Sequence, residues 1–231
     1  MIWQAFYEEF IIEKGYLSVL DGIKITLITA ICALIIGVVI GTIIAFVQII
    51  KSNNIGIRAL KAVFNVYVAF FRGTPIVVQL LFIYFVVFPL MGLGTMMPEI
   101  VGIIIFGLNS GAYVSEIMRG GILSVDVGQT EAGRALGLSA VMTMVRIVFP
   151  QAIKNVIPTI ANEFVSLLKE TSVLSFIGVV DLTQAFKEIA GANYEYTVPY
   201  LVLALSYLVL VLIATGLVKI LERRLRASDK R

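Results

Sequence analysis

The stretch from Ile25 to Ile50 contains no charged residue and is almost wholly apolar. A helix needs about 20 predominantly apolar residues to cross the hydrocarbon core of a bilayer, and this stretch is long enough. In the whole chain 59% of residues are hydrophobic and 14% are charged, whereas a typical soluble domain has about 25% charged residues. The sequence therefore predicts an all-α integral membrane protein.

Four further stretches have the length of a span, although charges and prolines interrupt two of them. We expect five transmembrane helices in one domain that covers residues 1–231. Charges within two of the spans, such as Arg72 and Glu163, cannot face lipid and must face protein or a cavity. The predicted spans are residues 23–50, 61–88, 98–118, 151–170 and 196–221.

The charges between the spans predict the orientation of the chain. Loops on the cytoplasmic side of a membrane are enriched in Lys and Arg. The connection after the first span is basic, as are the connection at residues 119–150 and the C-terminal tail. The N-terminal segment and residues 169–195 carry more acids than bases. The pattern predicts an N-terminus outside and a C-terminus inside.

Several classes of function are disfavoured by composition. The chain has no histidine and a single cysteine, so the commonest metal ligand and general base are missing and we expect no metal site and no catalytic residues. A net charge of +3, scattered along the chain, does not suggest a nucleic-acid partner. There is no Gly-Lys dipeptide and hence no phosphate-binding loop, so any ATPase must be a separate protein.

The predicted cytoplasmic loop, residues 120–150, is too apolar and too helical in period for a plain linker. Asp126 can cap the N-terminus of a short helix, and Gly137 can end it. Ser139 can cap a second helix, which we expect to stop near Pro150. A short helix followed by a glycine suits docking into a groove on a soluble partner, but it equally suits an amphipathic helix on the lipid surface.

The run Glu131-Ala-Gly-Arg-Ala-Leu-Gly137, followed by Ile147-Val-Phe-Pro150, resembles the EAA loop of bacterial ABC importer permeases. This resemblance implies a type I ABC importer fold, in which the loop forms a coupling helix that docks into an ATPase subunit. Gly133 departs from the older consensus, which has a third alanine there. The residues to which the resemblance assigns ATPase coupling are Asp126, Glu131, Ala132, Arg134, Ala135 and Gly137.

Other motifs are similar to one branch of these proteins, the polar amino-acid permeases. They include Phe71-Arg-Gly-Thr-Pro75 and Ala112-Tyr113 with Glu116. The resemblance implies two ATPase subunits, which bind ATP and Mg, while this chain binds no cofactor. It also implies a second permease copy or a paralogue, an extracytoplasmic solute-binding protein, and a location in the bacterial inner membrane.

Glu163 is the strongest candidate for contact with substrate. An ionisable residue at membrane depth is by default a functional candidate, and a carboxylate suits an ammonium or guanidinium group. The alternative is an internal ion pair with Arg72 or Lys169. Because some relatives have an uncharged residue here, Glu163 favours a basic substrate, namely arginine, lysine or histidine, with glutamine still open. The predicted substrate-binding residues are Arg72, Thr74, Asn109, Tyr113, Asn162, Glu163 and Ser166.

The functional hypothesis is an ATP-driven importer that works by alternating access. An ion-coupled secondary amino-acid transporter is the alternative, and it would explain Glu163 as an ion site. It would leave the EAA-like loop unexplained, and five spans without an internal repeat are unusual for such carriers.

Two glycine pairs, Gly37-x3-Gly41 and Gly107-x3-Gly111, permit two helices to approach closely. We expect them to pack within one subunit. Neither pair identifies an interface between subunits.

Overall fold

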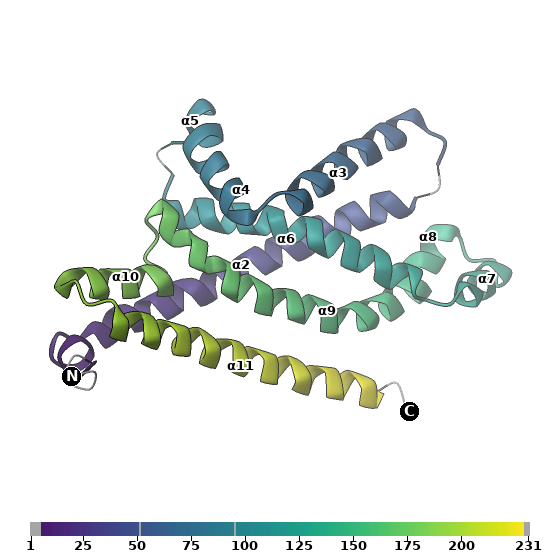
Figure 1. Ribbon diagram of the computed structural model, residues 1–231. Coiled ribbons are helices and arrows are strands. Elements are labelled where there is room, and N and C mark those ends of the chain that lie inside the picture. The colour runs from purple at the N-terminus through teal and green to yellow at the C-terminus, as the bar shows by residue number, and fades with distance from the viewer. Residues whose placement is uncertain (1–5, 51, 95, 229–231) are drawn as a thin grey trace.

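The computed structural model describes residues 6–50, 52–94 and 96–228, and these form helices joined by short connections (Figure 1). Four helical stretches in this part of the chain are long and apolar enough to cross a membrane. They are α2 (Gly15–Ile49), α6 (Pro98–Leu123), the stretch Ala140–Ile177, and α11 (Thr197–Ser228). A short π-helix, η1 (Tyr7–Ile12), precedes α2. The predicted all-α membrane fold is confirmed.

The second predicted span is sharply bent. It begins with α3 (Ile55–Gly73), continues as α4 (Ile76–Phe82) and η2 (Ile83–Val87), and ends with α5 (Phe88–Leu90). The two arms make an angle of 111° and form the V-shaped feature in Figure 1. Thr74 and Pro75 lie between the arms in extended backbone, because proline lacks the N–H that would continue the helix. Counted as one broken span, the pair makes five candidate spans.

The predicted end of a cytoplasmic helix near Pro150 is wrong. The helix that Ser139 caps continues without a break through α8 (Ala140–Thr143), η3 (Met144–Val148), α9 (Phe149–Glu170) and η4 (Thr171–Ile177). Pro150 lies at the start of α9, directly after the wider π-turn of η3. A π-turn makes room in the helix, so the proline ring need not stop it. The predicted cytoplasmic segment is therefore continuous with a membrane span.

The glycine pairs bring α2 and α6 into close contact, as the sequence predicts. A Cβ atom at Gly37 would lie 2.6 Å from Ser110 Oγ, and one at Gly41 would lie 2.7 Å from the backbone nitrogen of Ser115. The α6 glycines of the second pair lie equally close to α2, where their Cβ atoms would meet Ile36 and Ile40. The prediction of packing within one subunit is confirmed.

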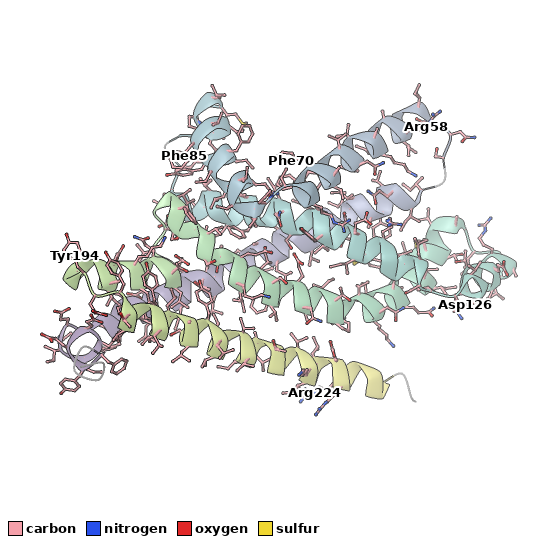
Figure 2. The ribbon with its side chains drawn as sticks, viewed as in Figure 1. Arg58, Phe70, Phe85, Asp126, Tyr194 and Arg224 are labelled. Carbon is pink, nitrogen blue, oxygen red and sulfur yellow. The ribbon has the colours of Figure 1, made fainter. Side chains whose placement is uncertain are left out.

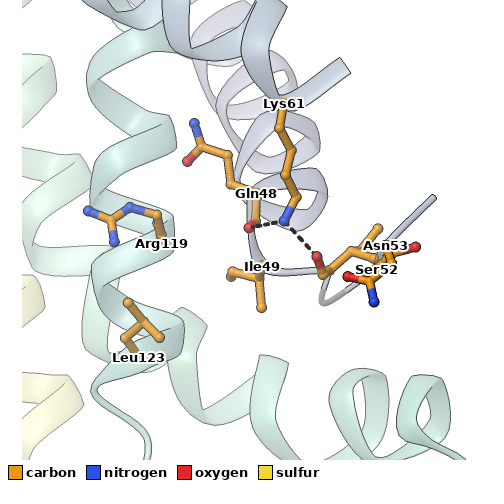
Figure 3. A pocket seen from close by; sticks show the side chains of 8 residues that line it. Gln48, Ile49, Ser52, Asn53, Lys61, Arg119 and Leu123 are labelled. Carbon is orange, nitrogen blue, oxygen red and sulfur yellow. Dashed lines mark hydrogen bonds between the residues drawn. The ribbon is translucent and has the colours of Figure 1, made fainter. Parts of the chain in front are cut away.

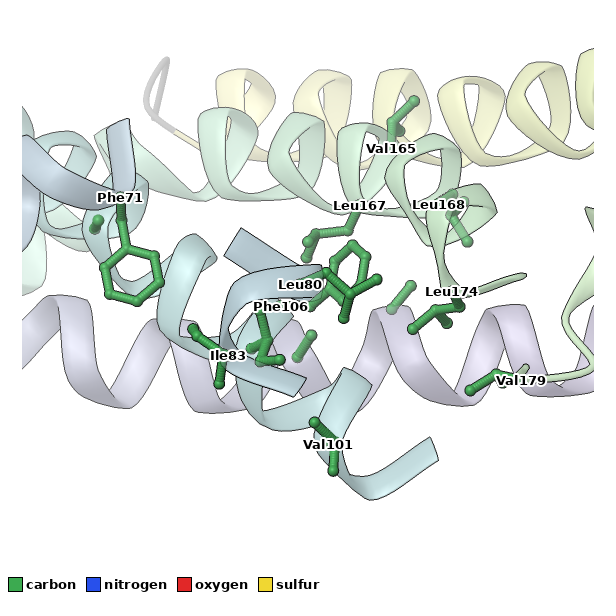
Figure 4. Close-up of a cluster of buried hydrophobic side chains, with 14 of the residues drawn as sticks. Phe71, Leu80, Ile83, Val101, Phe106, Val165, Leu167, Leu168, Leu174 and Val179 are labelled. Atoms are coloured by element: carbon green, nitrogen blue, oxygen red, sulfur yellow. The ribbon is translucent and has the colours of Figure 1, made fainter. Parts of the chain in front are cut away.

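The main hydrophobic core lies where the bent span, α6 and α9 converge (Figure 4). Leu80 of α4, Phe106 of α6 and Leu167 of α9 are each 0% exposed. Leu174 of η4 closes the same cluster. These contacts fix the positions of the three elements that carry most of the predicted substrate residues.

The two ends of the helix bundle differ. Arg58, Asp126 and Arg224 lie toward one end, and Tyr194 lies at the other (Figure 2). We call these the α7 end and the α10 end, after α7 (Val127–Ala135) and α10 (Leu182–Asn193). The predicted N-out, C-in orientation would place the α7 end in the cytoplasm.

Helix α10 was not predicted from the sequence. The carboxylate of Asp181 caps it, accepting hydrogen bonds from the backbone N–H groups of Thr183 and Gln184 at 3.1 and 3.0 Å. Asp181 is fully buried, and this burial raises the pKa of its carboxyl group. The backbone N–H of Leu182 donates to Thr26 Oγ1 at 3.3 Å. This last bond attaches α10 to α2.

Candidate transport face and coupling helix

Buried amides hold the bend between α3 and α4. The carbonyl oxygen of Phe71 accepts hydrogen bonds from Gln79 Nε2 at 2.9 Å and from Asn109 Nδ2 at 3.3 Å. Asn109 also donates to Gln79 Oε1 at 2.9 Å, and Gln79 Nε2 also donates to the carbonyl of Thr74 at 2.8 Å. A broken helix at membrane depth leaves carbonyls that need such partners.

This network gives two of the predicted substrate residues, Thr74 and Asn109, a definite place. Both take part in the bend, and Asn109 is 3% exposed. Their contact with substrate stays a prediction. Gln79 was not among the predicted site residues. The sequence signal for it was present, because a glutamine in an apolar segment, four residues after a proline, needs a polar partner once it is buried.

Arg72 lies at the end of α3 and contacts two residues of α6. Its guanidinium carbon is 5.5 Å from the centre of the Tyr113 ring, and its Nη1 is 3.8 Å from Glu116 Oε2. Arg119 Nη2 lies closer to the same carboxylate oxygen, at 2.8 Å. Arg72 therefore pairs with Glu116 rather than with Glu163, the partner that the sequence analysis considered.

Helix α9 carries a stripe of polar side chains at spacings of three and four residues. Such spacing places them on one face of the helix, and all are exposed except Ser166, which is half-buried. Polar side chains at membrane depth do not face lipid, so protein or water must cover this stripe. Its members are Asn155, Thr159, Asn162, Ser166 and Lys169.

Glu163 lies at the edge of this stripe and is half-buried. Its carboxyl group lies against the Ser110 hydroxyl of α6, and Ser110 in turn contacts Gly37 of α2. The neighbouring Asn162 points outward and donates to the carbonyl of Pro158 in its own helix at 3.0 Å. The two adjacent residues therefore have different surroundings.

Helices α6 and α9 adjoin. Asn155 Nδ2 of α9 donates to Ser124 Oγ, just beyond the end of α6, at 3.0 Å. Val156 packs against Gly121, where a Cβ atom would lie 2.0 Å away. We call the polar residues of these two helices, together with Arg72 at the end of α3, the polar face. Its residues are Arg72, Tyr113, Glu116, Arg119, Asn162, Glu163 and Ser166.

A pocket of about 680 Å³ opens between α2, α3 and α6 (Figure 3). Lys61 Nζ crosses it and donates to the carbonyls of Gln48 at 2.9 Å and Ile50 at 2.6 Å, at the end of α2. Arg119 and Leu123 of α6 form the opposite wall (Figure 3). The sequence analysis did not find this pocket, because residues far apart in the chain line it.

Helix α7 begins and ends where the sequence predicts. Asp126 Oδ1 accepts a hydrogen bond from the backbone N–H of Gly128 at 2.7 Å. Gly137 follows the helix with a φ of +80°, a conformation that glycine adopts without strain. Ser139 Oγ then accepts from the N–H of Met142 at 3.2 Å and starts α8.

One face of α7 is open and the other is fixed to the span. All six residues predicted to couple to an ATPase are exposed. Gly133 is buried instead, and a Cβ atom there would lie 2.7 Å from Thr143 Cγ2 and 2.8 Å from Ile147 Cδ1. Gln151 Nε2 of α9 also donates to Gln129 Oε1 of α7 at 3.1 Å. The departure from the consensus at Gly133 thus permits close contact between α7 and η3.

Residues 37–227 match the family described as "Binding-protein-dependent transport system inner membrane component". The chain belongs to this family. It is 39% identical over 212 residues to a putative glutamine transport system permease protein, GlnP, of Rickettsia bellii, covering 92% of this chain and 94% of that protein. It is 36% identical over 220 residues to the arginine transport system permease protein ArtQ of Bacillus subtilis, covering 91% and 94%.

Solved structures agree with this membership. A crystal structure of an amino acid ABC transporter with histidines matches with a TM-score of 0.81 at 38% identity, covering 92% of this chain and 96% of that one. The MetNI methionine ABC transporter, in inward-facing form, matches with a TM-score of 0.74 at 17% identity, which shows the fold alone. The chain is thus a multi-pass inner membrane permease subunit of an ABC importer and not an enzyme. This result decides against the ion-coupled carrier.

Proposed function

We propose that this chain lines the membrane pathway of an ATP-driven importer of polar amino acids, with a preference for arginine, lysine or histidine. Glutamine is the other candidate substrate. The similar permeases named above are assigned to glutamine and arginine, and a third, TcyB of Bacillus subtilis at 37% identity, is assigned to L-cystine. Because the three sequence identities are nearly equal, they do not discriminate among these amino acids. The choice of substrate therefore has to be argued from the side chains of the candidate site.

The observation that carries the preference is the environment of Glu163. In the part of the chain that the structure describes, no Lys or Arg lies within ion-pair distance of its carboxyl group, since the two ion pairs found there both involve Glu116. A carboxylate at membrane depth without a counter-ion is costly. A cationic side chain of the substrate would supply the missing charge.

The other predicted residues would contact the common part of an amino acid. Arg72, beside Tyr113, would hold the α-carboxylate, since a guanidinium group matches a carboxylate in shape and charge. Asn162 and Ser166 would offer hydrogen bonds from α9. Thr74 and Asn109 would act nearby by fixing the bend in the backbone.

The coupling helix would transmit ATP-driven movement to this surface. Glu131 and Arg134 are exposed on α7 and suit a groove on an ATPase subunit. Because α7 is fixed to η3 and α9, a displacement of α7 would move the helix that carries Glu163. Alternating access would follow if ATP binding and hydrolysis open the polar face to each side of the membrane in turn.

The assembly would contain two ATPase subunits, which bind ATP and Mg. A second permease, either another copy or a paralogue, would cover the polar stripe of α9, which lipid cannot cover. An extracytoplasmic solute-binding protein would dock at the α10 end, near residues 181–193, and deliver the substrate.

Uptake into proteoliposomes tests the proposal. The chain would be co-expressed with its ATPase and binding protein, and uptake of arginine and glutamine would be measured with ATPase activity. Glu163→Gln should lower arginine uptake at least about tenfold, because losing a desolvated charge pair costs more than about 1.4 kcal/mol. Glutamine uptake should change less than about threefold, which corresponds to well under 1 kcal/mol.

Glu131→Ala is the matched control, because it changes the coupling helix and leaves the substrate site intact. It should lower uptake of both amino acids equally and separate ATP hydrolysis from transport. Equal losses of arginine and glutamine uptake in Glu163→Gln would leave Glu163 a structural residue. Uptake driven by an ion gradient without ATP would contradict the proposed function itself.

A further inference from the structure

Two arginines of the polar face share one carboxylate unequally. Arg119 engages both oxygens of Glu116, with Nη2 at 2.8 Å from Oε2 and Nε at 3.4 Å from Oε1. Arg72 reaches only Oε2, at 3.8 Å, near the limit of an ion pair. Glu116 is therefore committed to Arg119, its neighbour one turn along α6, and holds Arg72 weakly.

The cluster carries an excess positive charge. Both guanidinium groups stay charged at any pH that proteins meet, and Glu116 supplies a single negative charge. Among the residues that the structure describes, no other Asp or Glu lies within 4 Å of either arginine. A net charge within a membrane span is costly unless an anion balances it. The cluster is thus suited to receive one carboxylate.

The excess charge is accessible on Arg72. Its side chain is 44% exposed, and it lies directly before the bend in the second span. The Tyr113 ring supports the guanidinium group from one side and cannot neutralise its charge. Among the described residues Arg72 has no other polar partner, so its remaining N–H groups can meet an anion on the polar face.

We propose that Arg119 is a positioning residue, which occupies Glu116 and so leaves Arg72 available for the α-carboxylate of the amino acid. This inference rests on the proposed function, in which Arg72 binds that carboxylate. Without Arg119, Glu116 would have Arg72 as its one cationic partner among the described residues. A bidentate arginine–carboxylate pair, with two parallel hydrogen bonds, is strong. Glu116 would then compete with the substrate for Arg72.

The proposal predicts a pattern that a structural role would not produce. Loss of Arg119 should be harmful only while Glu116 is present, because Glu116 is the competitor. Arg119→Lys keeps a charge beside Glu116 and should stay close to the wild type. A substrate analogue without a carboxylate should not be affected at all.

Equilibrium binding to the purified transporter complex measures this pattern. The probes are labelled arginine and agmatine, which is arginine without its carboxylate. Arg119→Gln should weaken arginine binding at least about tenfold, or about 1.4 kcal/mol, and leave agmatine binding unchanged. The double variant Glu116→Gln with Arg119→Gln should return to within about threefold of the wild type. Arg72→Gln should weaken arginine binding with no rescue by Glu116→Gln.

Three results would overturn the inference: a double variant as weak as Arg119→Gln, equal losses for arginine and agmatine, or normal arginine binding by Arg119→Gln. If Arg119→Gln fails to fold, Glu116→Gln alone decides, since it should bind arginine at least as tightly as the wild type. Weaker binding would overturn the proposal. A wild-type complex that transports neither arginine nor glutamine would instead count against the proposed function.

Discussion

Helix α6 has two sides that differ in packing, exposure and charge. Toward α2 it presents glycines and small side chains, and the two helices form the most extensive helix pair in the described part of the chain. Toward α3 it presents Tyr113 and Glu116, with Arg119 one turn along the helix, and all three keep considerable exposure. We call the closely packed side toward α2 the sealed side, and the exposed, charged side toward α3 the open side.

Under the proposed function, one helix would serve both stability and transport. Small residues let backbones approach, and in lipid this packing is a main source of association. Polar residues at membrane depth are by default functional candidates, and here we propose that they line the transport route. Substitutions on the sealed side should therefore affect folding, whereas those on the open side should affect transport and leave the fold intact.

Enlarging a glycine on the sealed side should have the largest effect. A Cβ atom at Gly41 would lie 2.7 Å from backbone and side-chain atoms of α6, so Gly41→Leu has to separate two helices. Overpacking typically costs about 1–3 kcal/mol and occasionally more, and we expect Gly41→Leu to lie at the upper end of that range because the helix backbones themselves have to separate. The measurement is thermal unfolding of the purified complex, compared with its yield from the membrane.

Gly120→Leu is the control for this prediction. Gly120 lies near the C-terminal end of α6 and is exposed. No atom outside its own helix turn lies within 4 Å of a Cβ added there. It should unfold within about 0.5 kcal/mol of the wild type, as ordinary surface substitutions do. Similar losses in both variants would show that the two sides of α6 do not differ in packing.

The bend of the second span should be less sensitive. Asn109→Leu removes the donor to Gln79 Oε1 and one of the two donors to Phe71 O. A buried acceptor left unpaired costs about 1–3 kcal/mol, and hydrogen bonds in membranes fall at the low end of that range. We expect a loss of about 1–2 kcal/mol, measured by the same unfolding assay.

A double-mutant cycle sharpens this second prediction. Gln79→Leu alone should also destabilise, because Phe71 O and Thr74 O lose a donor. The two substitutions together should cost less than the sum of the single ones, since the side chains bond each other. Additive losses would mean that the amides do not act as one network.

Local patterns were sufficient to predict much of this structure. Apolar length predicted long membrane helices, Asp126 and Gly137 bounded α7, and the glycine spacing predicted a tight helix pair. These features depend on residues close together in the sequence. The continuation of the helix past Pro150 was missed because the π-turn of η3 accommodates the proline, and sequence rules treat proline as a helix breaker.

The polar face was predicted only in part. The candidates Arg72, Tyr113 and Glu163 could be found because charged or polar residues stand out in apolar spans. The pairing of Arg72 with Glu116 and the pocket beside Arg119 could not, because they depend on how α3 crosses α6. The two arms of the second span meet at 111°, and no local rule gives either that angle or the crossing of α3 over α6.

The smallest expected effect concerns the contact between α3 and α6. The hydroxyl of Tyr67 donates to the carbonyl of Leu108 and lies 2.9 Å from where a Cβ atom at Gly111 would be. Tyr67→Phe removes this bond but keeps the ring packing against Phe71. Since Leu108 O also belongs to the backbone ladder of α6, its loss should cost about 0.5–1 kcal/mol in the unfolding assay. A larger loss, comparable with that of Gly41→Leu, would mean that α3 is part of the sealed packing of α6 and that the open side is narrower than we infer.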